Sequence, residues 1–268
     1  MKKRYVIEKS GRVDLDDFDP KGTGGLQEGP EIDAKVKNDL EDLSDLQNLL
    51  YAARCHAVLI VLQGIDTAGK DGTIKHVFSG VNPQGCRVAS FKQPTEIELA
   101  HDYLWRVHAV CPAKGEIVVF NRSHYESVLV EGVHDLVPEK VWKKRYDEIV
   151  SFERLLHRSG TIILKFFLNL SKGEQKRRLL ERERDPRKRW KVNRSDWEER
   201  KLWNAYRAAY EEMLSKTSTS FAPWIVVPSD AKWYRNLVVA DAITDRLRPF
   251  KDEWEEEVER RGAAAMKR

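Results

Sequence analysis

A short loop between an apolar run and a helical segment constrains the fold of this chain more than any other feature. The run Ala57–Gln63 is rich in branched apolar residues and suits a strand buried on both faces of a parallel sheet. It leads into Gly64-Ile-Asp-Thr-Ala-Gly-Lys-Asp-Gly-Thr73, in which Gly64, Gly69 and Lys70 match the Walker A spacing GxxxxGK. Glycines let main-chain N–H groups turn inward around phosphate oxygens, while the helix N-terminus and the lysine add positive charge. The sequence therefore predicts a phosphate-binding loop between a strand and a helix.

Strand and helix patterns alternate along the chain. Further strands are predicted at Arg87–Phe91, Gly115–Phe120, Thr161–Leu168 and Trp224–Val227. Helices are predicted at Glu31–Arg54, Thr73–Ser79, Thr95–Val110, Glu139–Arg158, Lys172–Glu183, Asp196–Ser215 and Lys232–Leu247. Alternation of this kind indicates an α/β fold, with helices on both faces of a parallel sheet. Residues 1–30 are expected to form an irregular N-terminal arm, residues 31–250 one domain, and residues 251–268 a charged, solvated helical tail.

Composition and targeting signals limit the class of protein. The 268 residues are 41% hydrophobic and 34% charged, which is typical of a globular protein. The net charge of +4 does not by itself demand a polyanionic partner. The three cysteines, Cys55, Cys86 and Cys111, have no metal-binding spacing and suit a reducing compartment. Because no secretory leader or membrane-spanning stretch is evident, we expect a cytoplasmic protein without a membrane partner.

The acidic positions around the phosphate loop depart from the usual Walker pattern. The Ser or Thr that normally follows the lysine and helps to hold magnesium is replaced by Asp71. The strand Gly115–Phe120 ends in Asn121 and Arg122, where a metal-binding carboxylate would be expected. Asp66, inside the loop, is therefore the expected Mg²⁺ ligand, with Glu126 as a further candidate.

Several uncommon motifs in order give the chain a family resemblance. They are Gly64–Thr73, Phe120-Asn-Arg-Ser-His-Tyr125, Glu183-Arg-Asp-Pro-Arg-Lys-Arg-Trp-Lys191, Val81–Gly85, Phe91–Thr95, His101–Arg106, Ser218–Trp224 and Lys232–Tyr234. Over residues 30 to 248 the sequence resembles the polyphosphate kinase 2 family. The resemblance implies a P-loop kinase fold, which is a three-layer α/β/α sandwich with a helical lid. It implies an activity that depends on Mg²⁺ and a protein that forms homo-oligomers. It also implies phosphoryl transfer between inorganic polyphosphate and nucleotides. Many members carry Asp at position 121, and the subgroup with Asn is associated with both AMP and ADP.

A basic segment follows the fourth predicted strand. Between residues 172 and 194 it contains Lys176, Arg177, Arg178, Arg182, Arg184, Arg187, Lys188, Arg189 and Lys191. Asp185-Pro186 interrupts it in the manner of a hinge. Arginine binds phosphate oxygens bidentately, so we favour a lid at about residues 172–200 that closes over phosphates. The alternative is a solvated charged face.

These patterns assign candidate roles. The candidate catalytic residues are Asp66, Lys70 and Arg122. The candidate phosphate-binding and polyphosphate-binding residues are Gly64, Ala68, Gly69, Asp71, Gly72, Thr73, Lys75, Arg178, Arg182 and Lys188. The candidate nucleotide-binding residues are Lys92, Arg106, Asn121, Glu126 and Asp185. His124 is not expected to carry a phosphoryl group, because transfer on phosphate loops is direct.

The predicted function is reversible, Mg²⁺-dependent transfer of a phosphoryl group from polyphosphate to AMP, to ADP or to both, with guanine nucleotides left open. An ATP-dependent nucleoside monophosphate kinase is the main alternative, since it would use the same loop and lid. An RNA-binding protein is a second alternative, but few aromatic residues accompany the basic run, so no nucleic-acid partner is expected.

Overall fold

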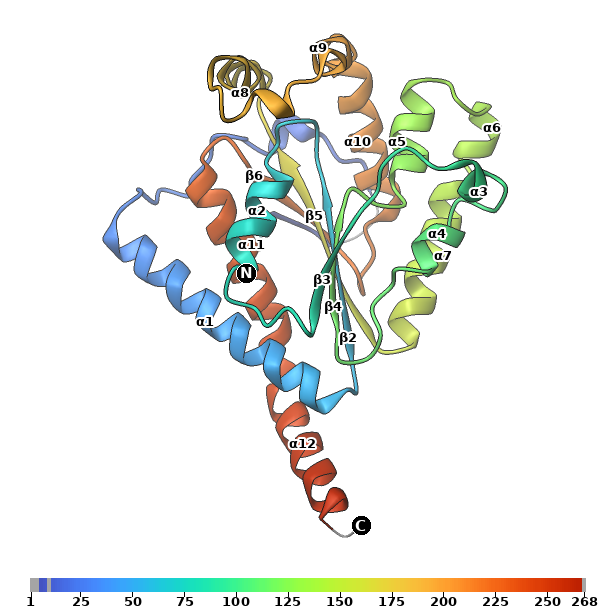
Figure 1. Cartoon of the computed structure of the whole chain (residues 1–268). Helices are drawn as coiled ribbons and strands as arrows, with labels where there is room; N and C mark the ends of the chain where they lie inside the picture. Colours follow the sequence, from blue (N-terminus) through green and yellow to red (C-terminus); the bar gives the residue numbers. More distant parts are fainter. Residues whose placement is uncertain (1–4, 9–10, 267–268) are drawn as a thin grey trace.

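The computed structural model describes residues 5–8 and 11–266. Figure 1 shows a central sheet with helices on both faces. The strands are β1 (Val6–Ile7), β2 (Ala57–Gln63), β3 (Cys86–Ser90), β4 (Ile117–Asn121), β5 (Thr161–Asn169) and β6 (Trp224–Pro228). Their order in the sheet is β1-β6-β5-β2-β4-β3, with β1 antiparallel to β6 and the other pairs parallel. The predicted α/β/α sandwich with a mainly parallel sheet is confirmed.

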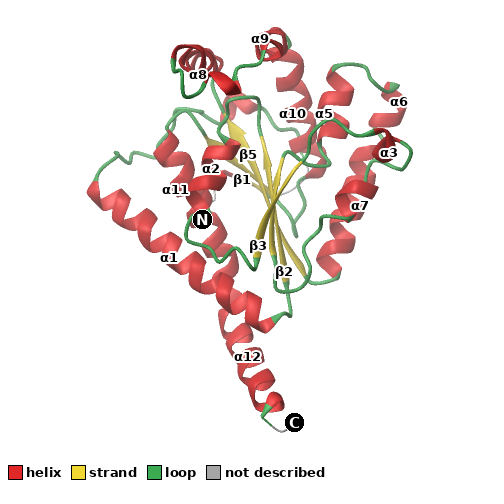
Figure 2. Ribbon diagram, viewed as in Figure 1, coloured by secondary structure: helices red, strands yellow, loops and turns green. Residues whose placement is uncertain are grey.

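The helices follow the predicted alternation. They are α1 (Pro30–Ala53), α2 (Lys70–Val77), α3 (Glu96–Leu99), α4 (Trp105–His108), α5 (Glu126–Val133), α6 (Glu139–Trp142), α7 (Arg145–Arg158), α8 (Lys172–Arg184), α9 (Arg194–Lys201), α10 (Trp203–Thr217), α11 (Lys232–Leu247) and α12 (Lys251–Ala265). In Figure 2 helices flank the yellow strands on both sides. None of the helices in the described part of the chain is long and apolar enough to cross a bilayer.

The central strand β2 supplies side chains to two separate hydrophobic cores. Val58, Ile60 and Leu62 pack with α1, α2, α11 and α12 on one face. Leu59 and Val61 pack with α5, α7 and α10 on the other face. Because successive side chains of a strand point to opposite faces, a continuous apolar run is what a strand between two helical layers requires.

Five expectations about secondary structure were wrong in detail. The predicted helices Thr95–Val110, Glu139–Arg158 and Asp196–Ser215 are each two helices. The first is interrupted where the Asp102 side chain accepts a hydrogen bond from the Leu104 N–H (2.9 Å), which competes with the helical bond. The N-terminal arm is not wholly irregular, since Val6–Ile7 pairs with β6. The C-terminal helix is not wholly solvated, because Trp254 is fully buried and its Nε1–H donates to His56 (3.1 Å).

A buried ion pair ties three elements together beneath the site. Lys165 on β5 and Glu153 on α7 lie 2.7 Å apart with no solvent exposure. The Lys165 ammonium also donates to the Thr217 carbonyl oxygen (2.7 Å), and the Tyr125 hydroxyl donates to Glu153 (2.7 Å). Burial lowers the pKa of Lys165. Burial would raise the pKa of Glu153, but Lys165 and His124 outweigh it and hold that pKa below its usual value. The network anchors the segment that carries Arg122, three residues before Tyr125.

Replacing one member of this pair should destabilise the fold strongly. Lys165→Met leaves the Glu153 carboxylate buried without its counter-ion, so we expect a loss of about 3–5 kcal/mol in the free energy of unfolding. Urea unfolding at neutral pH measures it. In the double variant Lys165→Met/Glu153→Gln the buried charge is gone but an acceptor for Tyr125 remains, so most of the loss should be recovered. A double variant no more stable than the single one would contradict this role.

Candidate active site

The phosphate loop connects β2 to α2 in a conformation that glycine favours. Gly64 has a φ of 152° and Gly69 a φ of 108°. A Cβ at Gly64 would lie 2.9 Å from the Leu168 carbonyl oxygen, and one at Gly69 would clash with the Arg235 guanidinium. Helix α2 begins at Lys70, one residue after Gly69, so its unpaired N–H groups face the loop. The strand, loop and helix predicted from the sequence are therefore present, although the helix starts three residues earlier than expected.

Lys70 is folded into the loop. Its side chain is buried, and its ammonium donates to the Gly64 carbonyl oxygen at 2.6 Å. Burial lowers the pKa of Lys70, while Asp66 acts in the opposite direction. A poorly solvated cation inside an amide-lined loop suits a bound phosphate oxygen.

Arg122 lies at the carboxyl end of β4, beside the loop. In the sheet Asn121 is the register partner of Leu62, which brings the two strand ends together. The Arg122 guanidinium is 2.8 Å from Asp66 and 3.5 Å from Glu126. Burial opposes its charge, but Glu126 and Asp66 together raise the pKa of Arg122. These three candidate charged side chains, which come from two separate parts of the chain, thus form one cluster.

Asn121 is directed toward the start of α2. Its Nδ2 donates to the Asp71 carboxylate at 2.8 Å, and Lys191 lies 3.5 Å from the same carboxylate. Although burial acts against it, the hydrogen bond from Asn121 and the charge of Lys191 lower the pKa of Asp71. Asp71 is therefore an ionised link between the loop, the end of β4 and the basic segment.

The basic segment forms α8, the 3₁₀ turn Arg189–Lys191 and α9, which lie above the loop in Figure 1. Carboxylates of the same segment form ion pairs with several of its basic side chains. Arg182 contacts Asp196 at 3.3 Å, and Lys188 contacts both Glu181 and Asp185. These pairs are partly exposed, so they stabilise the segment only weakly and leave the cations exchangeable.

Two predicted phosphate-binding side chains lie elsewhere. Arg178 is buried and directs its guanidinium at main-chain carbonyl oxygens, so it is not available to a ligand in this conformation. Lys75 is exposed in the last turn of α2, away from the loop. The predicted roles of Ala68, Gly72, Thr73, Arg182 and Lys188 remain predictions.

Two cavities meet at Arg122 and Glu126. A cavity of about 290 Å³ lies on the side of Gly64 and Asp66 and is closed by residues 193–199 of the basic segment. A larger cavity of about 700 Å³ contains Lys92 and Arg106, two of the predicted nucleotide-binding residues. Asn121 and Asp185 are not among the described residues that line this cavity. Asp185 instead accepts the Arg187 N–H at 3.0 Å.

Several residues that line the cavities were not predicted from the sequence. Arg145 reaches the large cavity from α7 and pairs with Glu131 at 2.6 Å, and nothing in the sequence around it suggested this. Asp196 contributes a carboxylate to the smaller cavity, where burial raises its pKa. His124 lines the large cavity but is almost fully buried against Glu153, and burial lowers its pKa. Such a histidine is poorly placed to carry a phosphoryl group.

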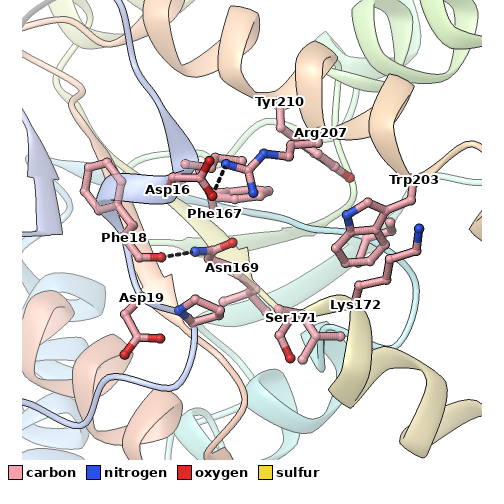
Figure 3. A pocket seen from close by; sticks show the side chains of 15 residues that line it. Asp16, Phe18, Asp19, Phe167, Asn169, Ser171, Lys172, Trp203, Arg207 and Tyr210 are labelled. Carbon is pink, nitrogen blue, oxygen red and sulfur yellow. Dashed lines mark hydrogen bonds and ion pairs between the residues drawn. The ribbon is translucent and has the colours of Figure 1, made fainter.

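A third cavity, of about 360 Å³, adjoins the loop at Ile65 (Figure 3). Its walls are mainly aromatic and aliphatic, and two pairs of its lining residues are engaged with one another. The Asn169 side chain donates to the Phe18 carbonyl oxygen at 2.7 Å, and Arg207 pairs with Asp16 at 2.8 Å. None of the predicted phosphate-binding or nucleotide-binding side chains lines it, so we treat it as separate from the candidate active site.

Comparison with known proteins agrees with the fold. The family model for polyphosphate kinase 2 matches residues 28–254. The chain is 53% identical to the AMP/ADP-polyphosphate phosphotransferase of Meiothermus ruber, over 91% of this chain and 92% of that protein. It is 44% identical to the ADP-polyphosphate phosphotransferase of Rhodopseudomonas palustris, over 93% and 90% of the two chains. The crystal structure of polyphosphate kinase 2 from Arthrobacter aurescens TC1 superposes with a TM-score of 0.86 at 40% identity, covering 91% of this chain and 89% of that one. The chain belongs to the polyphosphate kinase 2 family.

Proposed function

We propose that this protein transfers the terminal phosphoryl group of inorganic polyphosphate to AMP and then to ADP. The observation that carries the proposal is the position of Arg122. It stands where the phosphate-loop cavity meets the larger cavity, held between Asp66 and Glu126. A cation at such a junction can offset the charge of a phosphoryl group that moves from one cavity to the other.

The substrates that we propose are those in the names of the relatives. The Meiothermus ruber protein is an AMP/ADP-polyphosphate phosphotransferase, and this chain matches almost its whole length. The larger cavity, with Lys92, Arg106 and Arg145, would then take the acceptor nucleotide. The loop, with Lys70, would take the polyphosphate. Acceptance of guanine nucleotides, a homo-oligomeric state and a cytoplasmic location are parts of this proposal.

A divalent cation fits the donor set of the site. Asp66 and Glu126 converge on one guanidinium, and carboxylate oxygens are the ligands that Mg²⁺ prefers. Among the described residues, buried oxygens of Gln63, Thr67 and Thr73, all in or beside the loop, lack hydrogen-bond partners. Asp66 and Glu126 would hold the ion, and the bound ion would neutralise charge on the phosphate oxygens.

The residues of this chain position the donor phosphates and the phosphoryl group that is transferred. Loop amides and Lys70 hold the phosphates of the donor, and Arg122 faces the transferred group. The basic segment closes over the site and excludes water, which prevents loss of the phosphoryl group to hydrolysis. Burial raises the pKa of Glu126, yet its contacts with Arg122 and Lys70 favour the carboxylate. Little covalent chemistry is required of the protein, because transfer is direct.

Asn121 is compatible with two acceptors. An amide adds no negative charge at the end of β4, and here it binds Asp71. The acceptor side is therefore less negative than it would be with aspartate at this position. We infer that the terminal oxygen of either a monophosphate or a diphosphate can approach in line.

A time course tests the function. Protein purified free of adenylate kinase is mixed with Mg²⁺, polyphosphate and AMP, and the nucleotides are separated by chromatography. ADP should appear first and ATP later. Asn121→Asp should change the ratio of the AMP and ADP rates. A reaction that needs ATP as donor and ignores polyphosphate would instead identify a nucleoside monophosphate kinase.

The loop lysine should be essential. Lys70→Ala removes the buried cation from the phosphate-binding loop, so we expect kcat to fall by at least about 10²–10³-fold. Initial rates with polyphosphate and ADP measure the loss, and circular dichroism checks the fold. Lys37→Ala, at an exposed position on α1 (75% side-chain exposure), is the matched control and should behave like the parent. Near-parental turnover by folded Lys70→Ala would falsify the assignment of the loop.

A further inference from the structure

Two buried arginines meet behind the phosphate loop, and neither is among the described residues that line the three cavities. Arg178 comes from α8 and is 6% exposed, and Arg235 comes from α11 and is 3% exposed. They are close enough that the charge of Arg178 lowers the pKa of Arg235. Two like charges buried together are unfavourable unless another interaction compensates them.

Arg178 uses its whole guanidinium on the protein. Its Nε donates to Glu174 at 2.8 Å. Its two terminal nitrogens donate to four main-chain carbonyl oxygens, those of Thr67 (3.0 Å), Ala68 (3.2 Å), Ser229 (2.7 Å) and Asp230 (2.9 Å). Since arginine has five N–H donors, all of them are occupied. Arg178 therefore joins the loop to the segment after β6 and does not point toward substrate.

Arg235 has no acidic partner among the residues that the structure describes. It donates to the Asn236 side chain at 3.2 and 2.9 Å and to the Ala68 carbonyl oxygen at 3.3 Å. No ion pair within the described part of the chain includes it. Burial, with a contribution from Arg178, lowers its pKa to about 10. Glu174, which also pairs with Arg177, is thus the one carboxylate that the described contacts provide for two buried cations.

Both arginines hold the same carbonyl oxygen, that of Ala68. In a planar trans peptide the C=O of one residue and the N–H of the next point in opposite directions. Fixing the Ala68 carbonyl toward the arginines therefore turns the Gly69 N–H away from them, toward the mouth of the loop. No main-chain acceptor among the described residues takes this N–H. The clash predicted for a Cβ at Gly69 shows how closely Arg235 packs against this peptide.

We propose that Arg178 and Arg235 are positioning residues that orient the Ala68–Gly69 peptide for phosphate and supply positive charge that a bound phosphate anion compensates. The proposal rests on the proposed function of the loop. It assigns to Arg178 a structural contact behind the loop in place of a contact with polyphosphate in the lid. It also means that the protein without phosphate carries a destabilising pair of charges, which phosphate binding relieves.

The test measures binding and stability separately, with Arg235→Met as the main variant. Calorimetric titration with Mg²⁺-tripolyphosphate should show at least a tenfold weaker affinity than the parent. The KM for polyphosphate should rise by more than kcat falls. Without ligand, the unfolding midpoint should be unchanged or higher, because a buried unpaired charge has been removed. Arg246→Met, on the same helix but remote from the loop, should bind like the parent.

Charge-conserving variants separate positioning from packing. Arg235→Lys keeps the cation and should recover part of the affinity. Arg178→Lys keeps the charge but cannot span the carbonyl oxygens, so its affinity should fall. If Arg235→Met does not fold, the two lysine variants alone decide, and parental affinity in both would overturn the proposal. Parental affinity in folded Arg235→Met would overturn it as well. A parent that does not bind tripolyphosphate would instead overturn the proposed function.

Discussion

The parallel pairing of β2 with β4 is the constraint on which the site depends. It sets Leu62 beside Asn121, so the phosphate loop and the Arg122 segment leave the sheet at the same edge. In parallel sheets ligands bind outside the carboxyl ends of the strands, where such loops meet. Two cores, one on each face of β2, fix this edge, and the buried Lys165–Glu153 pair holds the segment that follows β4. The residues of the site are thereby positioned by buried elements of the fold.

Charge balance explains how a site so rich in cations exists without substrate. Arg122 is paired with Asp66 and Glu126, Lys191 with Asp71, and Arg182 with Asp196. Polyphosphate and a metal ion would replace these internal partners, the anion taking the cations and the metal taking the carboxylates. Partly exposed pairs exchange at small cost. The buried arginines behind the loop are the exception, because a bound anion is what balances them.

The parallel strands, most helices and the phosphate loop were predictable because each depends on local pattern. An apolar run of six residues, a GxxxxGK spacing and a 3.6-residue period need no tertiary information. The antiparallel β1 strand and the buried Trp254 escaped prediction, since both depend on partners more than 190 positions away along the chain. The direction in which the Arg178 side chain points could not be predicted from the sequence either. A basic helix indicates charge but not which of its residues faces inward, and only the packing against Ser229 and Asp230 decides it. Arg235 stood next to a recognised motif, yet a single arginine in an apolar helix gives no sign of what it contacts.

In the proposed function the main-chain amides of the loop bind the phosphates of the donor. Hydrogen exchange measured by mass spectrometry, with and without Mg²⁺-tripolyphosphate, reports on these amides. Exchange should be slower in the peptide that spans residues 64–73, with additional protection in α8 and α9 as the basic segment closes. Protection of α8 and α9 with no change in residues 64–73 would contradict it, because the polyphosphate would then be bound by the basic segment alone.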